Sequence, residues 1–368
     1  MGMLFTSARL GALTLKNRIV RSATAERMAD AEGRPRPALG ELYRDLAEGG
    51  VGLIITGHMY VDPGGKCHPE MTGIDRDDRV PDLAELADIV HEAGGRLAVQ
   101  INHGGMQCSR ETVADPVAPS AIEGEFVQRP ARAMTTAEIE HAIAAYGSAA
   151  RRAKAAGFNA VQLHGAHGYL INQFLSPAVN RRRDAWGGDF AGRLHFLEAV
   201  SAAVREAVGP DYPVFIKLGM ADGVEGGLTP ELGQRVVAEL AGMDLDGIEI
   251  SGGIGGGPIQ NTRTGVRTQE DEAYFRDFAR MAREVTSLPL MLVGGLRSRE
   301  VMEDVLAAGD ADFISMCRPL ICEPDLPERL KRGQARAACI SANRCWASEK
   351  GEGIACKCPV ERKPFPGS

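Results

Sequence analysis

The chain has 368 residues, of which 44% are hydrophobic and 25% are charged, and its formal net charge is −7. These values fit a globular protein with a large core, and they give no general attraction to nucleic acid or to an anionic membrane surface. No apolar run has the length of a signal peptide or a membrane helix, so we expect a cytoplasmic protein.

Short β-branched runs alternate along the chain with segments of helical periodicity. The predicted strands are 17–23, 51–57, 96–102, 160–165, 214–219, 247–252, 290–295 and 312–317. The predicted helices are 38–47, 83–93, 137–156, 194–208, 232–240, 275–285 and 301–307. Strand–helix units repeated eight times over roughly 300 residues favour a single closed (β/α)8 barrel, or TIM barrel.

Two segments fall outside this repeat. Residues 104–134 form a long polar excursion after the third strand, and we expect it to cover the barrel mouth as a lid. Residues 336–368 are rich in cysteine, and we interpret them as a C-terminal extension rather than an independent domain. The barrel itself is then predicted to span residues 1–335.

The fourth predicted strand ends in His164, followed by His167 and Tyr169. Catalytic residues of such barrels lie where strands end. Two imidazole N–H groups at one strand end can hold a carbonyl oxygen, and a phenol is protonated at neutral pH and can donate a proton. A zinc fragment and a pair of histidines bonded to the backbone are the alternatives for the two histidines.

Lys217 is a cation on an otherwise apolar strand. Because a buried ammonium needs a partner, it faces either an anionic ligand or an acidic side chain on a neighbouring strand. Gly294, Gly295 and Arg318 lie in the loops after strands seven and eight, which are the usual phosphate-binding loops of these barrels.

The chain resembles the old yellow enzyme family over roughly residues 4–333. The resemblance rests on LKNRIVRSAT, LAVQINHGG, HGAHGYLINQFLSPAVNRRRDAWGGDFAGR, LMLVGGL and ADFISMCRPLICEPDLPERL. It implies a non-covalently bound FMN, NADH or NADPH as hydride donor, and reduction of the activated C=C bond of α,β-unsaturated carbonyl compounds. It also allows a homo-oligomer.

The same resemblance assigns residues. It implies that His164 and His167 hold the substrate oxygen and that Tyr169 donates a proton. The implied cofactor-binding residues are Ala23, Thr24, Ala25, Gly57, Gln100, Lys217, Gly294, Gly295, Cys317 and Arg318. Two positions depart from the family pattern: Ala25 stands where Thr or Cys is common, and Lys217 stands where Arg is common.

Cysteines crowd the C-terminal end at Cys339, Cys345, Cys356 and Cys358. The trimethylamine dehydrogenase branch of the family binds a four-iron cluster with a Cys-x2-Cys-x2-Cys-x12-Cys motif. The second position of that motif is Ala342 in this chain, so we expect no intact iron–sulfur cluster. The four thiols are weak candidates for zinc ligands, and a metal-free remnant is the expected state.

Three alternatives remain open. A flavin-dependent amine or dienoyl-thioester oxidoreductase would use the same barrel. A non-redox lyase or isomerase would bind a substrate phosphate at Gly294 and Gly295 and use Lys217 as a nucleophile. A catalytically silent barrel would serve only as a binding module. The colour of the purified protein separates the flavin-dependent functions from the others.

Overall fold

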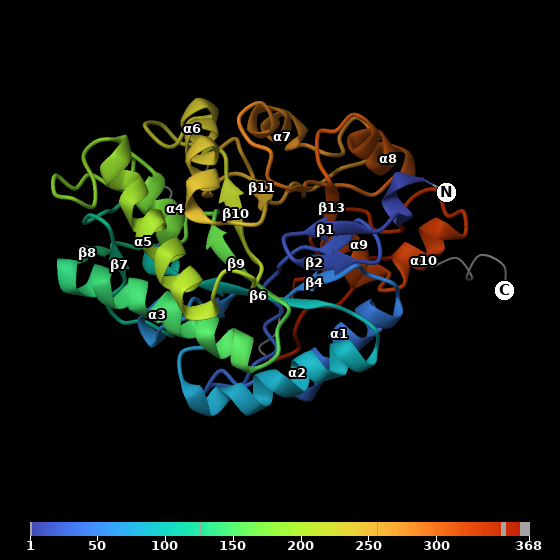
Figure 1. The fold of residues 1–368 in the computed structure, drawn as a ribbon, viewed down its shortest axis with the longest axis horizontal. Coiled ribbons are helices and arrows are strands. Elements are labelled where there is room, and N and C mark those ends of the chain that lie inside the picture. Colours follow the sequence, from blue (N-terminus) through green and yellow to red (C-terminus); the bar gives the residue numbers. More distant parts are fainter. Residues whose placement is uncertain (1, 125–126, 128, 256, 347–350, 361–368) are drawn as a thin grey trace.

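The computed structural model describes residues 2–360 except 125, 126, 128, 256 and 347–350. Eight parallel strands form a closed barrel, in which each strand pairs with the next and β13 pairs with β3 (Figure 1). In order around the barrel they are β3 (Ile19–Arg21), β4 (Leu53–Ile55), β6 (Leu97–Asn102), β9 (Ala160–Gly165), β10 (Val214–Gly219), β11 (Ile248–Ser251), β12 (Leu290–Leu292) and β13 (Phe313–Met316). The predicted barrel is confirmed.

Helices cover the outside of the barrel (Figure 1). The main ones are α1 (Pro37–Glu48), α2 (Val80–Glu92), α3 (Thr136–Ala155), α5 (Phe190–Val208), α6 (Pro230–Leu240), α7 (Arg276–Arg283) and α8 (Arg299–Ala307). Shorter helices are α4 (Leu170–Leu175), α9 (Arg318–Cys322) and α10 (Leu326–Lys331). Within the described residues, no helix combines the length and the apolar character that crossing a membrane requires.

Alternation along each strand divides the core into two parts. Outward side chains such as Ile54 pack against the helices, whereas inward side chains such as Leu53 and Ile55 fill the barrel. Leu10 and Leu15 belong to the inner cluster, and they come from the hairpin of β1 (Ala8–Leu10) and β2 (Leu13–Leu15). The hairpin therefore closes the end of the barrel where the strands begin.

The next inward layer is polar. It contains Gln100, Gln162, Lys217 and Glu249. The first three each lie two residues after an inward apolar residue of the same strand, and Glu249 lies beside Lys217 on the adjacent strand. Gln100 is in register with Gln162, and Lys217 is in register with Glu249. The barrel thus has an apolar floor and a polar upper layer, which places hydrogen-bonding chemistry at the carboxyl ends of the strands.

The excursion after β6 contains the short strands β7 (Val117–Ala118) and β8 (Arg132–Ala133). Its apolar side chains Met106, Ala118 and Ile122 form a small cluster with Val179, beyond α4. No described residue of 104–134 lines the main cavity of the barrel, so its role as a lid stays a prediction.

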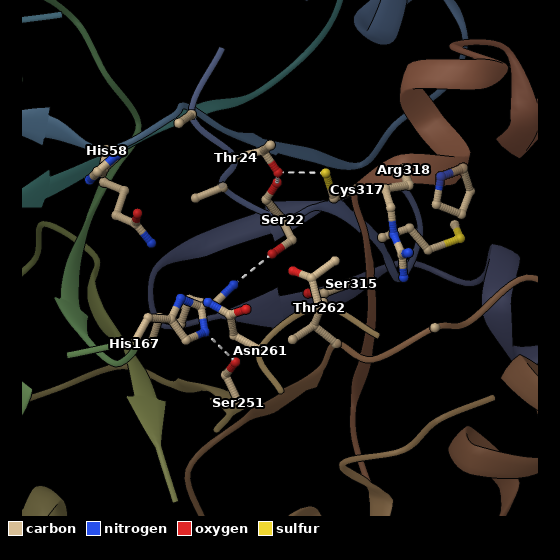
Figure 2. A pocket seen from close by; sticks show the side chains of 18 of the residues that line it. Ser22, Thr24, His58, His167, Ser251, Asn261, Thr262, Ser315, Cys317 and Arg318 are labelled. Atoms are coloured by element: carbon tan, nitrogen blue, oxygen red, sulfur yellow. Dashed lines mark hydrogen bonds between the residues drawn. The ribbon is translucent and has the colours of Figure 1, made fainter. Parts of the chain in front are cut away.

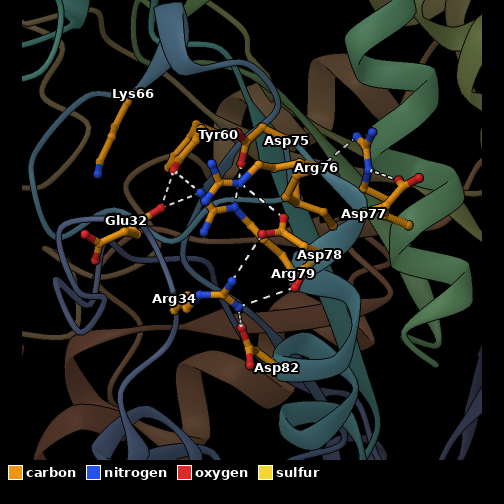
Figure 3. Close-up of polar contacts among 12 residues, drawn as sticks. Glu32, Arg34, Tyr60, Lys66, Asp75, Arg76, Asp77, Asp78, Arg79 and Asp82 are labelled. Atoms are coloured by element: carbon orange, nitrogen blue, oxygen red, sulfur yellow. Dashed lines mark hydrogen bonds and ion pairs between the residues drawn. The ribbon is translucent and has the colours of Figure 1, made fainter.

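An ion-pair network ties the loop before α1 to the loop before α2 (Figure 3). Buried Arg79 pairs with buried Asp75 at 2.6 Å and donates a hydrogen bond to the hydroxyl of Tyr60, on β5 (Met59–Tyr60), at 2.9 Å. On the exposed side of the same network, Arg34 pairs with Asp78 at 3.2 Å. These contacts fix the long connection between β3 and α1 against the barrel.

The burial difference within this network predicts two unequal losses of stability. Asp75→Asn leaves the buried Arg79 guanidinium without a counter-charge and should lower the free energy of unfolding by about 3–5 kcal/mol. Asp78→Asn removes an exposed partner and should cost less than about 1 kcal/mol. Urea unfolding of both variants measures the difference, and equal small losses would contradict the assignment of Asp75 as the structural anchor.

Candidate active site

A cavity of about 300 Å³ lies at the carboxyl ends of the barrel strands. Its walls come from nearly every strand end, and Figure 2 shows the side chains that converge on it. The predicted residues that line it are Ala23, Thr24, Ala25, Gln100, His164, His167, Tyr169, Lys217, Gly295, Cys317 and Arg318. Residues far apart in the sequence therefore meet in one site.

Gly57 and Gly294 are the two predicted site residues that do not line the cavity. The N–H of Gly57 donates to Glu26 Oε1 at 2.8 Å, and a Cβ at this position would collide with the Glu26 carboxylate. The Gly57 N–H thus already has a protein partner, and contact between Gly57 and the cofactor stays a prediction. At Gly294, φ is +135°, and Tyr274 and Phe275 pack where a side chain would lie, so packing explains this glycine.

His164 lies on β9 and His167 lies in the turn that follows, with their ring centroids 5.2 Å apart. His164 Nδ1 accepts from the N–H of Ala166, which leaves its proton on Nε2. His167 has a left-handed backbone (φ 62°), and its Nε2 is 2.7 Å from Ser251 Oγ. Burial, with nearby positive charge from Lys217, lowers the pKa of both imidazoles well below the ordinary value. Both rings are therefore neutral hydrogen-bonding groups at neutral pH.

Tyr169 is the next side chain on the same wall of the cavity. Its ring centroid lies 4.6 Å from that of His164 and 5.0 Å from that of His58. Burial raises the pKa of this phenol above its ordinary value, because a phenolate would lose its hydration. The hydroxyl therefore keeps its proton across the physiological range.

Lys217 has the acidic partner that the sequence left as one alternative. Its Nζ donates to Ser22 Oγ at 2.8 Å and lies 3.4 Å from Glu249 Oε2, on the neighbouring strand. The same Glu249 oxygen accepts from Gln162 at 2.9 Å, and Gln162 accepts from Gln100 Nε2 at 2.7 Å. Lys217 still lines the cavity, so its charge acts on the site while Glu249 offsets part of it.

The opposite end of the cavity carries two more cations, Arg297 and Arg318. Arg318, the first residue of α9, donates to the carbonyl of Arg263 and to Asn343 Oδ1 at 2.7 and 2.8 Å. Ser315 Oγ lines the cavity and is buried without a hydrogen-bond partner. This end offers several donors to an anionic group.

Thr24 and Ala25 approach the cavity from the loop after β3. The Thr24 hydroxyl donates to the Cys317 sulfur, so it already has a protein partner and does not replace the hydrogen bond that Ala25 cannot make. The side of the cavity near Ala25 consequently lacks the donor that Thr or Cys would bring.

These residues fit an FMN. Lys217 and Gln100 offer a cation and an amide at one end, Arg318 and the unpartnered Ser315 hydroxyl offer donors at the other, and no described residue lining the cavity is acidic. A phosphate and the carbonyl-bearing edge of a flavin, which becomes negatively charged on reduction, both match such a set of donors.

Several cavity residues were not predicted from the sequence. His58 and Ser251 follow β4 and end β11, so the strand-end rule could have identified them. Arg27, Trp346 and Ile354 also line the cavity, and no local pattern signals them. The last two belong to the C-terminal extension, where the N–H of Ile354 donates to the Glu26 carbonyl at 3.0 Å.

The C-terminal cysteines are the candidate metal ligands of the chain, and Ala342 stands in the second position of the four-iron motif. Within the described residues, no group of three or more His, Cys, Asp or Glu side chains is arranged to hold a metal ion. Cys345 packs with Ile321 and Ile354, and burial raises its pKa to about 12. The side chain of Cys345 is therefore packed in apolar surroundings, and the absence of an intact cluster stays a prediction.

Comparisons with known proteins identify relatives of this chain. The chain is 35% identical over 364 residues to an NADH oxidase of Thermoanaerobacter brockii. The aligned region covers 97% of this chain and 55% of that protein. It is 34% identical to an NADPH dehydrogenase of Geobacillus sp. (strain WCH70), covering 94% of this chain and 98% of that protein. The chain spans about half the length of the curated relatives it matches first.

A solved structure has a similar fold. The old yellow enzyme homologue of Zymomonas mobilis superposes with a TM-score of 0.79 at 28% identity, covering 92% of this chain and 95% of that one. The sequence profile of the NADH:flavin oxidoreductase / NADH oxidase family matches residues 3–337. The chain therefore belongs to this family of FMN-dependent NAD(P)H oxidoreductases, which includes the old yellow enzymes.

Proposed function

We propose that the chain is an ene-reductase that reduces the activated C=C bond of α,β-unsaturated carbonyl compounds. The observation that carries this proposal is one wall of the cavity, where two neutral imidazoles and a protonated phenol lie together at the end of β9. FMN, when bound, accepts hydride from NADH or NADPH and passes it to the substrate.

The residues of the chain supply binding and proton transfer. His164 and His167 donate hydrogen bonds to the substrate carbonyl oxygen and stabilise the negative charge that develops there. Tyr169 gives its proton to the α-carbon, while the β-carbon accepts the hydride. Lys217 and Gln100 hold the polar edge of the cofactor, and Arg318 with Gly295 holds its phosphate.

The rival functions have less support. A lyase that uses Lys217 as nucleophile needs a free amine, but this ammonium is paired with Glu249 and Ser22. An amine or dienoyl-thioester oxidoreductase of the cluster-containing type needs four ligands, and Ala342 removes one.

Purified protein should be yellow and should bleach with NADH or NADPH. The cytoplasmic location, a homo-oligomer and the division at residue 335 stay predictions from the sequence.

Tyr169→Phe should separate the two half-reactions. Reduction of bound FMN by NADH or NADPH needs no proton from this phenol, so its rate should stay near the wild-type value. Reoxidation by 2-cyclohexenone needs that proton and should slow by about 10²–10⁴-fold. Stopped-flow absorbance measures both halves. Equal slowing of the two, with FMN still bound, would contradict the role of Tyr169 as proton donor.

The same pKa shifts predict a flat pH profile. The pKa of each histidine is lowered, so both imidazoles stay neutral as the pH falls through 6.5, and the pKa of Tyr169 is raised, so the phenol stays protonated as the pH rises toward 10. Reoxidation by 2-cyclohexenone should therefore show no inflection near pH 6.5. A clear inflection there that disappears in His164→Ala or His167→Ala would show that these imidazoles titrate normally.

Lys217 and Glu249 should shift the potential of bound FMN in opposite directions. Lys217→Met removes a cation that favours the reduced, more negative cofactor, so the midpoint potential should fall by an amount on the order of tens of millivolts. Glu249→Gln removes the offsetting negative charge, so the potential should rise. Lys217→Arg keeps the charge and serves as the control. Equal potentials in all four proteins would mean that the pair does not act on the cofactor.

A further inference from the structure

The charged side chains that line the cavity are all positive. They are Arg27, Lys217, Arg297 and Arg318, and no described lining residue is Asp or Glu. A cofactor phosphate and the polar edge of a flavin account for the cations at the two ends of the cofactor site. They do not account for Arg27, which lies at the exposed rim of the cavity.

Arg27 differs from the other three cations in its partners. Lys217 donates to Ser22, Arg297 donates to the carbonyl of Val266, and Arg318 donates to Asn343. Arg27 makes no hydrogen bond and no ion pair with any described residue. Its guanidinium therefore presents a full set of donors to whatever enters the cavity.

The backbone holds Arg27 in this position. Its φ is +57°, a left-handed conformation that is uncommon for a residue with a side chain. The neighbouring residues are clamped: the Glu26 carboxylate pairs with Arg21 at 2.8 Å, and the Met28 carbonyl accepts from the N–H of Arg36 at 2.9 Å. The contacts of the residues on both sides therefore hold the backbone of residue 27 in its left-handed conformation.

Arg27 and Tyr169, the proposed proton donor, line the same cavity. Although burial raises the pKa of Tyr169, the positive charge of Arg27 acts on this phenol in the opposite direction, and it also acts on the ring of His68. A ligand whose carbonyl is held by His164 and His167 would therefore occupy the cavity that Arg27 also lines.

We propose that Arg27 recognises a carboxylate on the unsaturated substrate, so that the enzyme prefers acidic enones to their neutral esters. The proposal rests on the proposed function for its substrate class. A planar guanidinium binds a carboxylate through two parallel hydrogen bonds, and the unpartnered fork of Arg27 provides that geometry at the cavity rim. The diphosphate of the nicotinamide cofactor is also an anion that a guanidinium can bind. The experiments below separate a substrate carboxylate from the cofactor diphosphate.

The first measurement needs no turnover. Holoenzyme is titrated with 4-hydroxybenzoate and with methyl 4-hydroxybenzoate, and binding is followed through the absorbance of oxidised FMN. Arg27→Gln should lower the affinity for the acid relative to the ester by about tenfold to a hundredfold, the range of hydrogen bonds to charged groups. Arg27→Lys should lie between Arg27→Gln and the wild type. Raising the salt concentration should reduce the wild-type preference, because the site is open to solvent.

The matched control is Arg9→Gln. Arg9 is exposed on β1, in the hairpin that closes the opposite end of the barrel, so this variant loses the same charge far from the cavity. Its acid-to-ester ratio should equal that of the wild type. An equal loss of affinity for acid and ester in Arg27→Gln, or the same change of ratio in Arg9→Gln, would overturn the proposal.

The second measurement uses turnover. For an enone that carries a carboxylate, Arg27→Gln should raise KM more than it changes kcat, and the methyl ester of the same enone should show a smaller change. If Arg27→Gln instead weakens saturation by NADH or NADPH and leaves the acid-to-ester ratio intact, the anion is the cofactor diphosphate and the proposal is wrong. If neither enone is reduced while the phenol titrations still depend on Arg27, the ene-reductase function fails and anion recognition stands.

Discussion

A buried ion pair between neighbouring strands organises the mouth of this barrel. Glu249 is fully buried, and a carboxylate in that position is tolerated only when it is paired and hydrogen-bonded. Lys217 and Gln162 provide those partners, and Gln100 and Ser22 extend the chain of contacts to two further strands. These contacts link the groups into one polar layer through Glu249 Oε2, while Glu249 Oε1 is buried without a hydrogen-bond partner. The cavity therefore has a hydrogen-bonded base, and the Lys217 cation in that base lines it.

A second buried carboxylate, Glu26, organises the rim. Its Oε1 pairs with Arg21 and accepts from the Tyr43 hydroxyl and the Gly57 N–H, each at 2.8 Å, while its backbone carbonyl accepts from Ile354. One residue thus joins β3, α1, the end of β4 and the C-terminal extension. This junction places Trp346 and Ile354 in the cavity wall and fixes the backbone that carries Arg27.

The proposed chemistry follows from burial rather than from unusual residues. The same loss of hydration lowers the pKa of His164 and His167 and raises that of Tyr169, so each group stays in its neutral form. Neutral imidazoles can donate to a carbonyl oxygen without adding positive charge beside Lys217. The phenol of Tyr169, on the same wall of the cavity, keeps the proton that it donates. One physical cause therefore prepares both the oxygen-binding groups and the proton donor.

The sequence by itself determined the barrel, because strand and helix periodicity are local. It also determined that His164, His167 and Tyr169 lie together, because all three lie within six residues at the end of one strand. It could not determine the partners of these residues. Lys217 and Ser22 are 195 positions apart, Thr24 and Cys317 are 293 apart, and the N–H of Gly57 is occupied by Glu26. Nor does any local pattern show that the C-terminal extension forms part of the cavity wall. Closure of the barrel brings these distant segments together, and only the tertiary structure decides which polar groups meet.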